Sequence, residues 1–142
     1  MRALLDINVL LSLLDRDHVD HQRARAWLEA EISQGWASCA LTENGFVRII
    51  SQPRYPNPIP PAEAIARLAG ATEQPQHAFW NCDRSLLDAK FVDRTRIHGP
   101  KQVTDCYLLA LATAHGGRFV TFDRSISLAT VIGATSANLD VV

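Results

Sequence analysis

Residues 103–125 read VTDCYLLALATAHGGRFVTFDRS, and two acids in this stretch frame two apolar runs. The first run follows Asp105 and is typical of a buried helix over residues 106–115, whereas residues 118–122 are typical of a short strand that ends at Asp123. The helix would rise about 15 Å, and the strand would travel back about 16 Å. Two glycines between them permit the reversal. We therefore expect Asp105 and Asp123 to lie at the same edge of a sheet.

The rest of the chain repeats this alternation of short apolar strands and helices. Further strands are expected at residues 2–5, 36–40, 77–81 and 137–141, and further helices at residues 8–14, 20–34, 42–50, 61–70 and 85–92. Such alternation is typical of an α/β protein whose parallel sheet is covered on both faces. The chain has 142 residues, 47% of them hydrophobic, which suits one domain with a sizeable core. We expect a three-layer α/β/α fold with a central, mainly parallel sheet of about five strands.

Several classes of protein are disfavoured by the composition. No stretch reaches the roughly 18 consecutive apolar residues that a membrane span needs. Asp6 interrupts the apolar N-terminus, and no small-residue cleavage site follows, so we expect a cytoplasmic protein and not a secreted one. The three cysteines, Cys39, Cys82 and Cys106, form no CxxC pair. They are expected to be buried small hydrophobes and not zinc ligands.

Four acids are expected where strands meet the ligand-binding edge of the sheet. Asp6 and Asp123 directly follow strands, and Glu43 comes three residues after Ala40. Parallel α/β sheets bind ligands beyond the carboxyl ends of their strands. Four carboxylates gathered there with Asp105 would repel one another unless a cation balanced them. Oxygen-only ligands suit Mg²⁺ or Mn²⁺, and such an ion can activate water to hydrolyse a phosphodiester.

Structural roles offer a competing interpretation of each acid. Thr104 could cap a helix with Asp105 in its first turn, where a negative charge is favourable. Asp6 could cap a helix, Thr42 could begin one, and Asp123 could form a turn. The chain would then be a non-catalytic α/β interaction domain. A third possibility is a phospho-acceptor or phosphatase domain that uses Asp6 as its nucleophile.

Four motifs in order also resemble a known family. These are LLDINVLL (4–11), LTENGFVRIIS (41–51), VTDCYLLALA (103–112) and VTFDRS (120–125). They look like the motifs of PIN-domain ribonucleases, in particular the VapC toxins of bacterial toxin–antitoxin pairs. The motifs span nearly the whole chain, so the resemblance implies a single PIN-like domain over residues 1–142.

The resemblance carries its own expectations of site and activity. It implies a type II toxin that is a Mg²⁺-dependent endoribonuclease, Mn²⁺ being a possible substitute, with structured tRNA or rRNA as its substrate. It implies a homodimer and a VapB-like antitoxin. Metal-activated water would leave a 5′-phosphate product. The residues that match the catalytic, metal-binding acids are Asp6, Glu43, Asp105 and Asp123, and those that match supporting positions are Asn8, Thr104 and Thr121.

Contacts with RNA are less clearly marked. The net charge of −1 becomes +3 when the four negative site residues are set aside, so charge balance neither supports nor excludes an RNA substrate. Arg124, adjacent to Asp123, is the best candidate for a phosphate contact. His18 and His21 are spaced as zinc ligands can be, but no third or fourth ligand accompanies them.

Overall fold

A five-stranded sheet forms the centre of the computed structural model, which describes all 142 residues. Its strand order is β3-β2-β1-β4-β5, and every neighbouring pair is parallel. The strands are β1 (Ala3–Leu5), β2 (Trp36–Cys39), β3 (His77–Trp80), β4 (Arg118–Thr121) and β5 (Leu139–Val141). The predicted parallel sheet of five strands is thus confirmed.

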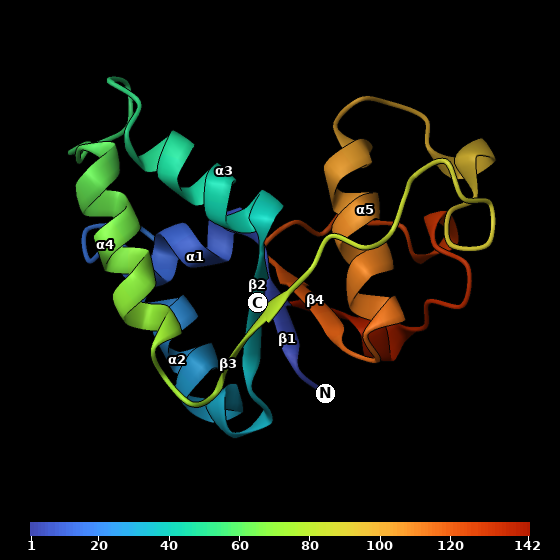
Figure 1. Ribbon diagram of the computed structural model, residues 1–142, viewed down its shortest axis with the longest axis horizontal. Helices are drawn as coiled ribbons and strands as arrows, with labels where there is room; N and C mark the ends of the chain where they lie inside the picture. Colours follow the sequence, from blue (N-terminus) through green and yellow to red (C-terminus); the bar gives the residue numbers. More distant parts are fainter.

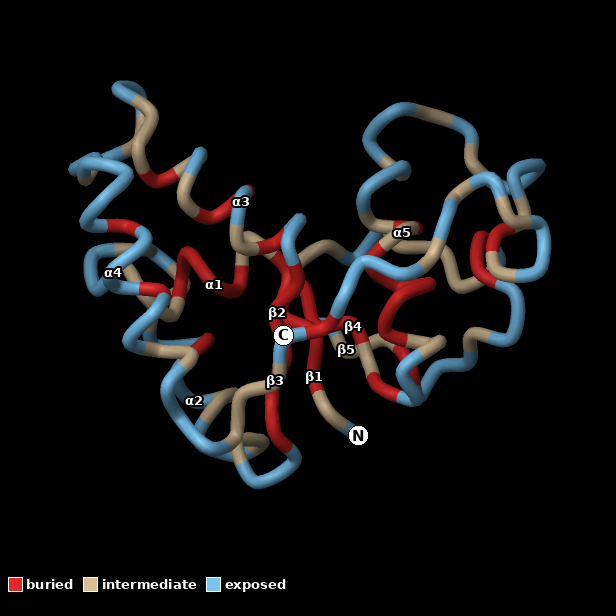
Figure 2. Tube along the Cα trace, in the orientation of Figure 1, coloured by how far each residue is buried: buried red, intermediate tan, exposed pale blue.

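Helices cover both faces of this sheet and give the expected three layers (Figure 1). One face carries α1 (Ile7–Leu14), α2 (His21–Glu31), α3 (Ala40–Ile50) and α4 (Pro61–Thr72), and the other carries α5 (Gln102–Ala114). Burial follows the same plan, because the buried residues concentrate on the strands and on the sheet-facing sides of the helices (Figure 2). Two apolar clusters result, one around α1, α3 and α4 and one around α5.

The strand order reverses beside β1. The chain passes from β1 to β2 and then to β3, moving outward in one direction, and afterwards crosses over to place β4 and β5 on the other side of β1. The carboxyl ends of β1 and β4 therefore flank a topological switch point, where open parallel sheets hold their ligands. Asp6 follows β1, and Asp123 lies just beyond β4.

Two glycines permit close packing, Gly45 near this point and Gly117 at the opposite, amino-terminal edge of the sheet. A Cβ atom on Gly45 of α3 would lie 2.2 Å from Cδ1 of Ile7 in α1. A Cβ atom on Gly117 would lie 2.6 Å from the Trp80 ring and 2.7 Å from the Arg2 carbonyl oxygen. Any side chain at either position would push apart the elements that carry the acids.

Some predicted boundaries were wrong. Residues 85–92 form turns and not a helix, because the Ser85 and Asp88 side chains accept hydrogen bonds from the backbone two residues on, a local alternative to helical bonding. Helix α4 continues past Gly70 to Thr72. The last strand is shorter than predicted, since a 3₁₀ turn occupies residues 136–138. Cys82 is exposed, whereas Cys39 and Cys106 are buried as expected.

Helix starts also differ from the cap assignments. Helix α5 begins at Gln102, so Thr104 lies inside its first turn and is not the N-cap. Helix α3 begins at Ala40, and Thr42 is its third residue, whose hydroxyl accepts a hydrogen bond from the Cys39 backbone. Neither shift alters which end of the helix meets the sheet edge.

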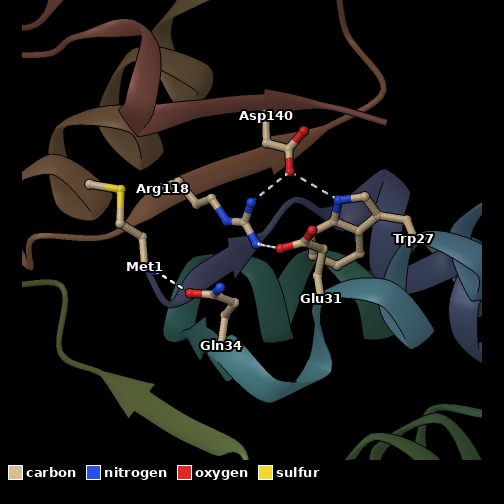
Figure 3. A network of polar contacts seen from close by, with 6 residues as sticks. All are labelled: Met1, Trp27, Glu31, Gln34, Arg118 and Asp140. Atoms are coloured by element: carbon tan, nitrogen blue, oxygen red, sulfur yellow. Dashed lines mark hydrogen bonds and ion pairs between the residues drawn. The ribbon is translucent and has the colours of Figure 1, made fainter.

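At the amino-terminal edge of the sheet, one arginine contacts acids from two other elements (Figure 3). The Arg118 side chain, 15% exposed, contacts Glu31 at 2.5 Å and Asp140 at 3.0 Å. Trp27 donates a hydrogen bond of 2.9 Å to the same Asp140 oxygen. These contacts join α2 to β4 and β5 at the edge opposite the switch point. None of the helices combines the length and the hydropathy that crossing a bilayer requires.

Candidate active site

Asp6 lies at the junction of β1 and α1 and is fixed by two hydrogen bonds. One carboxylate oxygen accepts from the Ile7 backbone at 2.7 Å, which makes Asp6 the N-cap of α1. The other accepts from the Thr121 hydroxyl at 2.6 Å. The side chain is only 7% exposed. Burial, and to a lesser degree the nearby charge of Asp123, raise the pKa of Asp6.

Thr121 and Asn8 link Asp6 to the Asp123 turn. Besides donating to Asp6, the Thr121 oxygen accepts from the Asp123 backbone at 3.0 Å and from the Asn8 amide at 3.3 Å. The side-chain oxygen of Asn8, Oδ1, in turn accepts from the Phe122 backbone at 3.4 Å. The buried Thr121 hydroxyl therefore donates one hydrogen bond and accepts two. These bonds connect the end of β1 to the end of β4.

Asp105 faces the same region from the first turn of α5. Burial first, and then the charges of Asp6 and Asp123, raise the pKa of Asp105 to about 6. Asp105 and Asp123 also line one pocket of about 90 Å³. The expectation that the helix and the return strand bring these two acids to one edge is therefore confirmed.

Asp123 combines a turn with its place beside the other acids. One of its carboxylate oxygens accepts from the Ser125 backbone at 2.7 Å and from the Ser125 hydroxyl at 2.6 Å. These hydrogen bonds lower the pKa of Asp123. The acid thus stays ionised while its charge disfavours ionisation of Asp6 and Asp105.

Glu43 is placed differently from the other three acids. It lies in the first turn of α3, at the carboxyl end of β2, but its Oε1 atom accepts a hydrogen bond of 2.6 Å from Ser38. It lines a groove of about 510 Å³ between α3 and α4, on the other face of the sheet from α5. None of the pKa shifts of Asp6, Asp105 and Asp123 has Glu43 among its causes.

The donor set fits a hard divalent cation, although the ligands are not drawn together. The charges of Asp6 and Asp123 raise the pKa of Asp105, and the charge of Asp123 raises the pKa of Asp6. A cation would neutralise this unbalanced negative charge. No nitrogen or sulfur ligand lines the pocket beside Asp105 and Asp123 except the buried thiol of Cys106, so the chemistry favours Mg²⁺ or Mn²⁺ over zinc. No three acidic, histidine or cysteine side chains form a ready ligand group.

The remaining candidates have lesser or different places. Thr104 is exposed and makes no side-chain hydrogen bond, and Arg124 is exposed beside Asp123 without an ion pair. His18 and His21 are not part of any group of three side chains that could hold a metal. The Nδ1 atom of His18 accepts from the Asp20 backbone, and the Nδ1 atom of His21 lies 2.7 Å from the Ser12 carbonyl oxygen.

Two residues that support Glu43 were not predicted from the sequence: one contacts the acid, and the other contacts the first. Ser38 in β2 binds Glu43, and His77 in β3 binds Ser38. Both stand on expected strands. The parallel pairing sets His77 opposite Trp36, so His77 and Ser38 are diagonal neighbours on one face of the sheet. Lys101 also lines the pocket with Asp105 and Asp123.

Comparison with known proteins decides the family. The family model for the PIN domain matches residues 3–131. The chain belongs to the PIN-domain family. This PIN domain is 68% identical to Ribonuclease VapC44 of Mycobacterium tuberculosis (strain ATCC 25618 / H37Rv), with 98% of each chain covered. It is 43% identical to Ribonuclease VapC39 of the same strain, over 89% of this chain and 92% of the relative. It is therefore a PIN domain of the VapC type.

A solved structure supports the fold independently. It is the crystal structure of VapBC2 from Rickettsia felis bound to a DNA fragment from their promoter, in which one chain superposes on this PIN domain with a TM-score of 0.56. The match covers 87% of this chain and 89% of that one at 14% identity. At such low identity the likeness concerns the fold alone.

Proposed function

We propose that this PIN domain is a divalent-metal-dependent endoribonuclease and the toxin of a VapBC-like pair. The observation that carries the proposal is the placement of Asp6, Asp105 and Asp123 at the switch point. There the charges of Asp6 and Asp123 raise the pKa of Asp105, and the charge of Asp123 raises the pKa of Asp6. Neither capping nor turn formation requires three acids from separate elements to meet. The high identity to a protein named as a ribonuclease supports the same activity.

The residues of the chain would divide the work of binding and orientation. Asp6, Asp105 and Asp123 would hold the cation, with Glu43 completing the site from α3. Thr121 keeps the Asp6 carboxylate turned toward β4, and Asn8 holds Thr121 and the turn after it. A bound Mg²⁺ or Mn²⁺ would orient the scissile phosphate and lower the pKa of the attacking water. Arg124 is placed to contact a phosphate of the RNA beside Asp123.

The substrate and partners follow from the family assignment and are part of the proposal. We propose structured RNA, tRNA or rRNA, as the substrate, a VapB-like antitoxin as the inhibitor, and a homodimer as the working form, in the cytoplasm. Because water and not the RNA 2′-hydroxyl is the nucleophile, the product carries a 5′-phosphate.

The test is cleavage of purified tRNA and rRNA by the antitoxin-free protein, with RNA ends mapped chemically. Cleavage with Mg²⁺ or Mn²⁺ should leave 5′-phosphate ends and stop when EDTA is added. Asp105→Asn should abolish cleavage. The control, Asp17→Asn, should not, because Asp17 is exposed and its carboxylate makes no hydrogen bond or ion pair. A 2′,3′-cyclic phosphate product would refute the mechanism. Covalent phosphate on Asp6 would favour a phospho-acceptor domain instead.

A further inference from the structure

A buried serine connects Glu43 to a histidine on the neighbouring strand. Ser38 lies in β2 with no exposed surface. Its hydroxyl oxygen is 2.6 Å from Oε1 of Glu43 and 2.8 Å from Nε2 of His77. The three side chains come from α3, β2 and β3, so the connection spans two strands and the helix that follows the first.

The proton count gives this connection a direction. A hydroxyl has one proton to donate, whereas an ionised carboxylate can only accept. The Ser38 proton therefore goes to Glu43, and the Ser38 oxygen must accept from His77. Neutral histidine protonated at Nε2 meets this requirement. In that arrangement the histidine donates to the serine and the serine donates to the acid.

His77 is itself held in place. Its ring lies against Trp36 with the centroids 4.4 Å apart and the planes at 56°. Burial, opposed by the charge of Glu43, lowers the pKa of His77. The ring is thus held with its Nε2 atom toward the Ser38 oxygen.

We propose that Ser38 and His77 are positioning residues that fix the Glu43 carboxylate beside the carboxyl end of β2. The proposal rests on the proposed function, in which Glu43 is one of the cation's ligands. A glutamate in the first turn of an exposed helix end would otherwise sample many rotamers. With Oε1 bound to Ser38, the other oxygen, Oε2, has no hydrogen-bond partner in the chain and is free to meet a cation or its water. Hydrogen-bond partners of metal ligands orient them in this way.

The test measures Mn²⁺ binding by calorimetry alongside RNA cleavage, so that one readout is independent of turnover. Ser38→Ala should weaken Mn²⁺ binding about tenfold, the lower end of what losing such a partner does. The matched control is Ser51→Ala, because the buried Ser51 hydroxyl has no hydrogen-bond partner. It should leave Mn²⁺ affinity unchanged, and thermal unfolding will show that both variants are folded.

Two substitutions of His77 separate its donor from its ring. His77→Phe keeps an aromatic ring against Trp36 but loses the donor, and it should weaken Mn²⁺ binding as Ser38→Ala does. His77→Gln keeps an N–H donor and should retain most of the affinity. Nitrogen NMR of the wild type should show His77 protonated at Nε2. An unprotonated Nε2, or Mn²⁺ affinity that is unchanged or tighter in Ser38→Ala and His77→Phe, would overturn the proposal.

Glu43→Gln distinguishes failure of this proposal from failure of the proposed function. If Ser38 acts through Glu43, Ser38→Ala should have no further effect in the Glu43→Gln background, since coupled changes are not additive. Should Glu43→Gln weaken Mn²⁺ binding while Ser38→Ala does not, the positioning role is wrong and the metal site stands. If Glu43→Gln itself leaves binding and cleavage intact, the assignment of Glu43 as a ligand is wrong.

Discussion

Asp105 is the residue at which opposing electrostatic effects of the site can be compared. Its side chain sits in the first turn of α5, where the helix dipole favours a negative charge, yet its pKa is raised to about 6. Burial and two neighbouring carboxylates therefore outweigh the helix terminus. The ionised form of this carboxyl group is disfavoured, although its place in the helix should favour it. Such perturbed pKa values are typical of functional sites.

This reversal gives a prediction for stability against pH. The pKa of Asp105 is about 6 in the folded state and about 3.9 in an unfolded chain. The folded state therefore binds more protons between these values, and the contribution of Asp105 to the free energy of unfolding falls as pH rises through this window. Without metal, Asp105→Asn should be more stable than wild type at pH 8 by about 1 kcal/mol, a figure reduced for the partial exposure of the group.

Urea denaturation in EDTA at pH 4 and pH 8 checks this expectation. The difference between Asp105→Asn and wild type should become small at pH 4, where the carboxyl is protonated in the folded state and in about half of the unfolded chains. Added Mn²⁺ at pH 8 should stabilise only the wild type. A variant less stable than wild type at pH 8 in EDTA would show that the favourable interaction of the Asp105 charge with the helix dipole dominates.

Thr121 is the second residue whose chemistry can be isolated. Its hydroxyl donates to buried Asp6 and accepts from the Asp123 backbone. Thr121→Val keeps the shape of the side chain and removes these two bonds and the one from the Asn8 amide, so the free energy of unfolding should fall by about 1–3 kcal/mol at pH 7. Thr121→Ser, which keeps the hydroxyl, should lose less. Urea denaturation gives the values, and equal losses for both variants would assign the effect to packing.

At the scale of elements, the approach of α1 to α3 brings Asp6 and Glu43 toward one edge. Gly45 permits that approach, because a Cβ atom there would meet the Ile7 side chain at 2.2 Å. Gly45→Ala should lower the free energy of unfolding by about 1–3 kcal/mol through overpacking, even though alanine has the higher helix propensity.

The cause can be tested by removing the obstacle. Ile7→Ala should cost clearly less in the Gly45→Ala background than in wild type, with a coupling energy above about 0.5 kcal/mol. Thermal or urea unfolding of the four proteins supplies the cycle. Simple additivity would mean that the helices do not depend on this contact for their separation.

Element boundaries show what a sequence pattern can and cannot predict. Helix α5 and β4 were predictable because a long apolar run, two glycines and a short strand leave little choice of geometry. Residues 85–92 were misread because their apolar content resembles a helix, whereas side-chain hydrogen bonds at Ser85 and Asp88 close turns. Val92 then pairs with Val131, about forty residues along the chain, a contact that no local pattern records.

For the molecule as a whole, topology explains why the meeting of Asp6, Asp105 and Asp123 was predictable. All three stand at ends of elements that a parallel sheet must bring to one edge. The orientation of Glu43 was not predictable in this way, because Ser38, which binds it, and His77, which contacts Ser38, belong to strands whose pairing had first to be known. Placement of the backbone follows from periodicity, whereas side-chain direction follows from tertiary partners.

The same topology places a stabilising ion-pair cluster and the candidate active site at opposite edges of the sheet. Arg118 begins β4 at the amino-terminal edge of the sheet, and Thr121 ends it beside Asp6. Arg118 bridges two acids that would otherwise repel each other, and its own side chain is 15% exposed. Removing it should therefore destabilise the fold without changing the carboxylates at the opposite edge.

Arg118→Leu should lower the free energy of unfolding by about 3 kcal/mol, since it leaves Glu31 and Asp140 uncompensated. The matched control, Arg25→Leu, breaks an ion pair of 3.2 Å between largely exposed side chains and should cost only about 0.5 kcal/mol. Urea denaturation measures both values. Because Arg118 touches none of the four acids, Mn²⁺ affinity and RNA cleavage per folded molecule at 25 °C should match wild type. A loss of Mn²⁺ affinity in folded Arg118→Leu would mean that the two edges of the sheet are coupled. The strands between them would then pass a structural change at Arg118 on to the carboxylates.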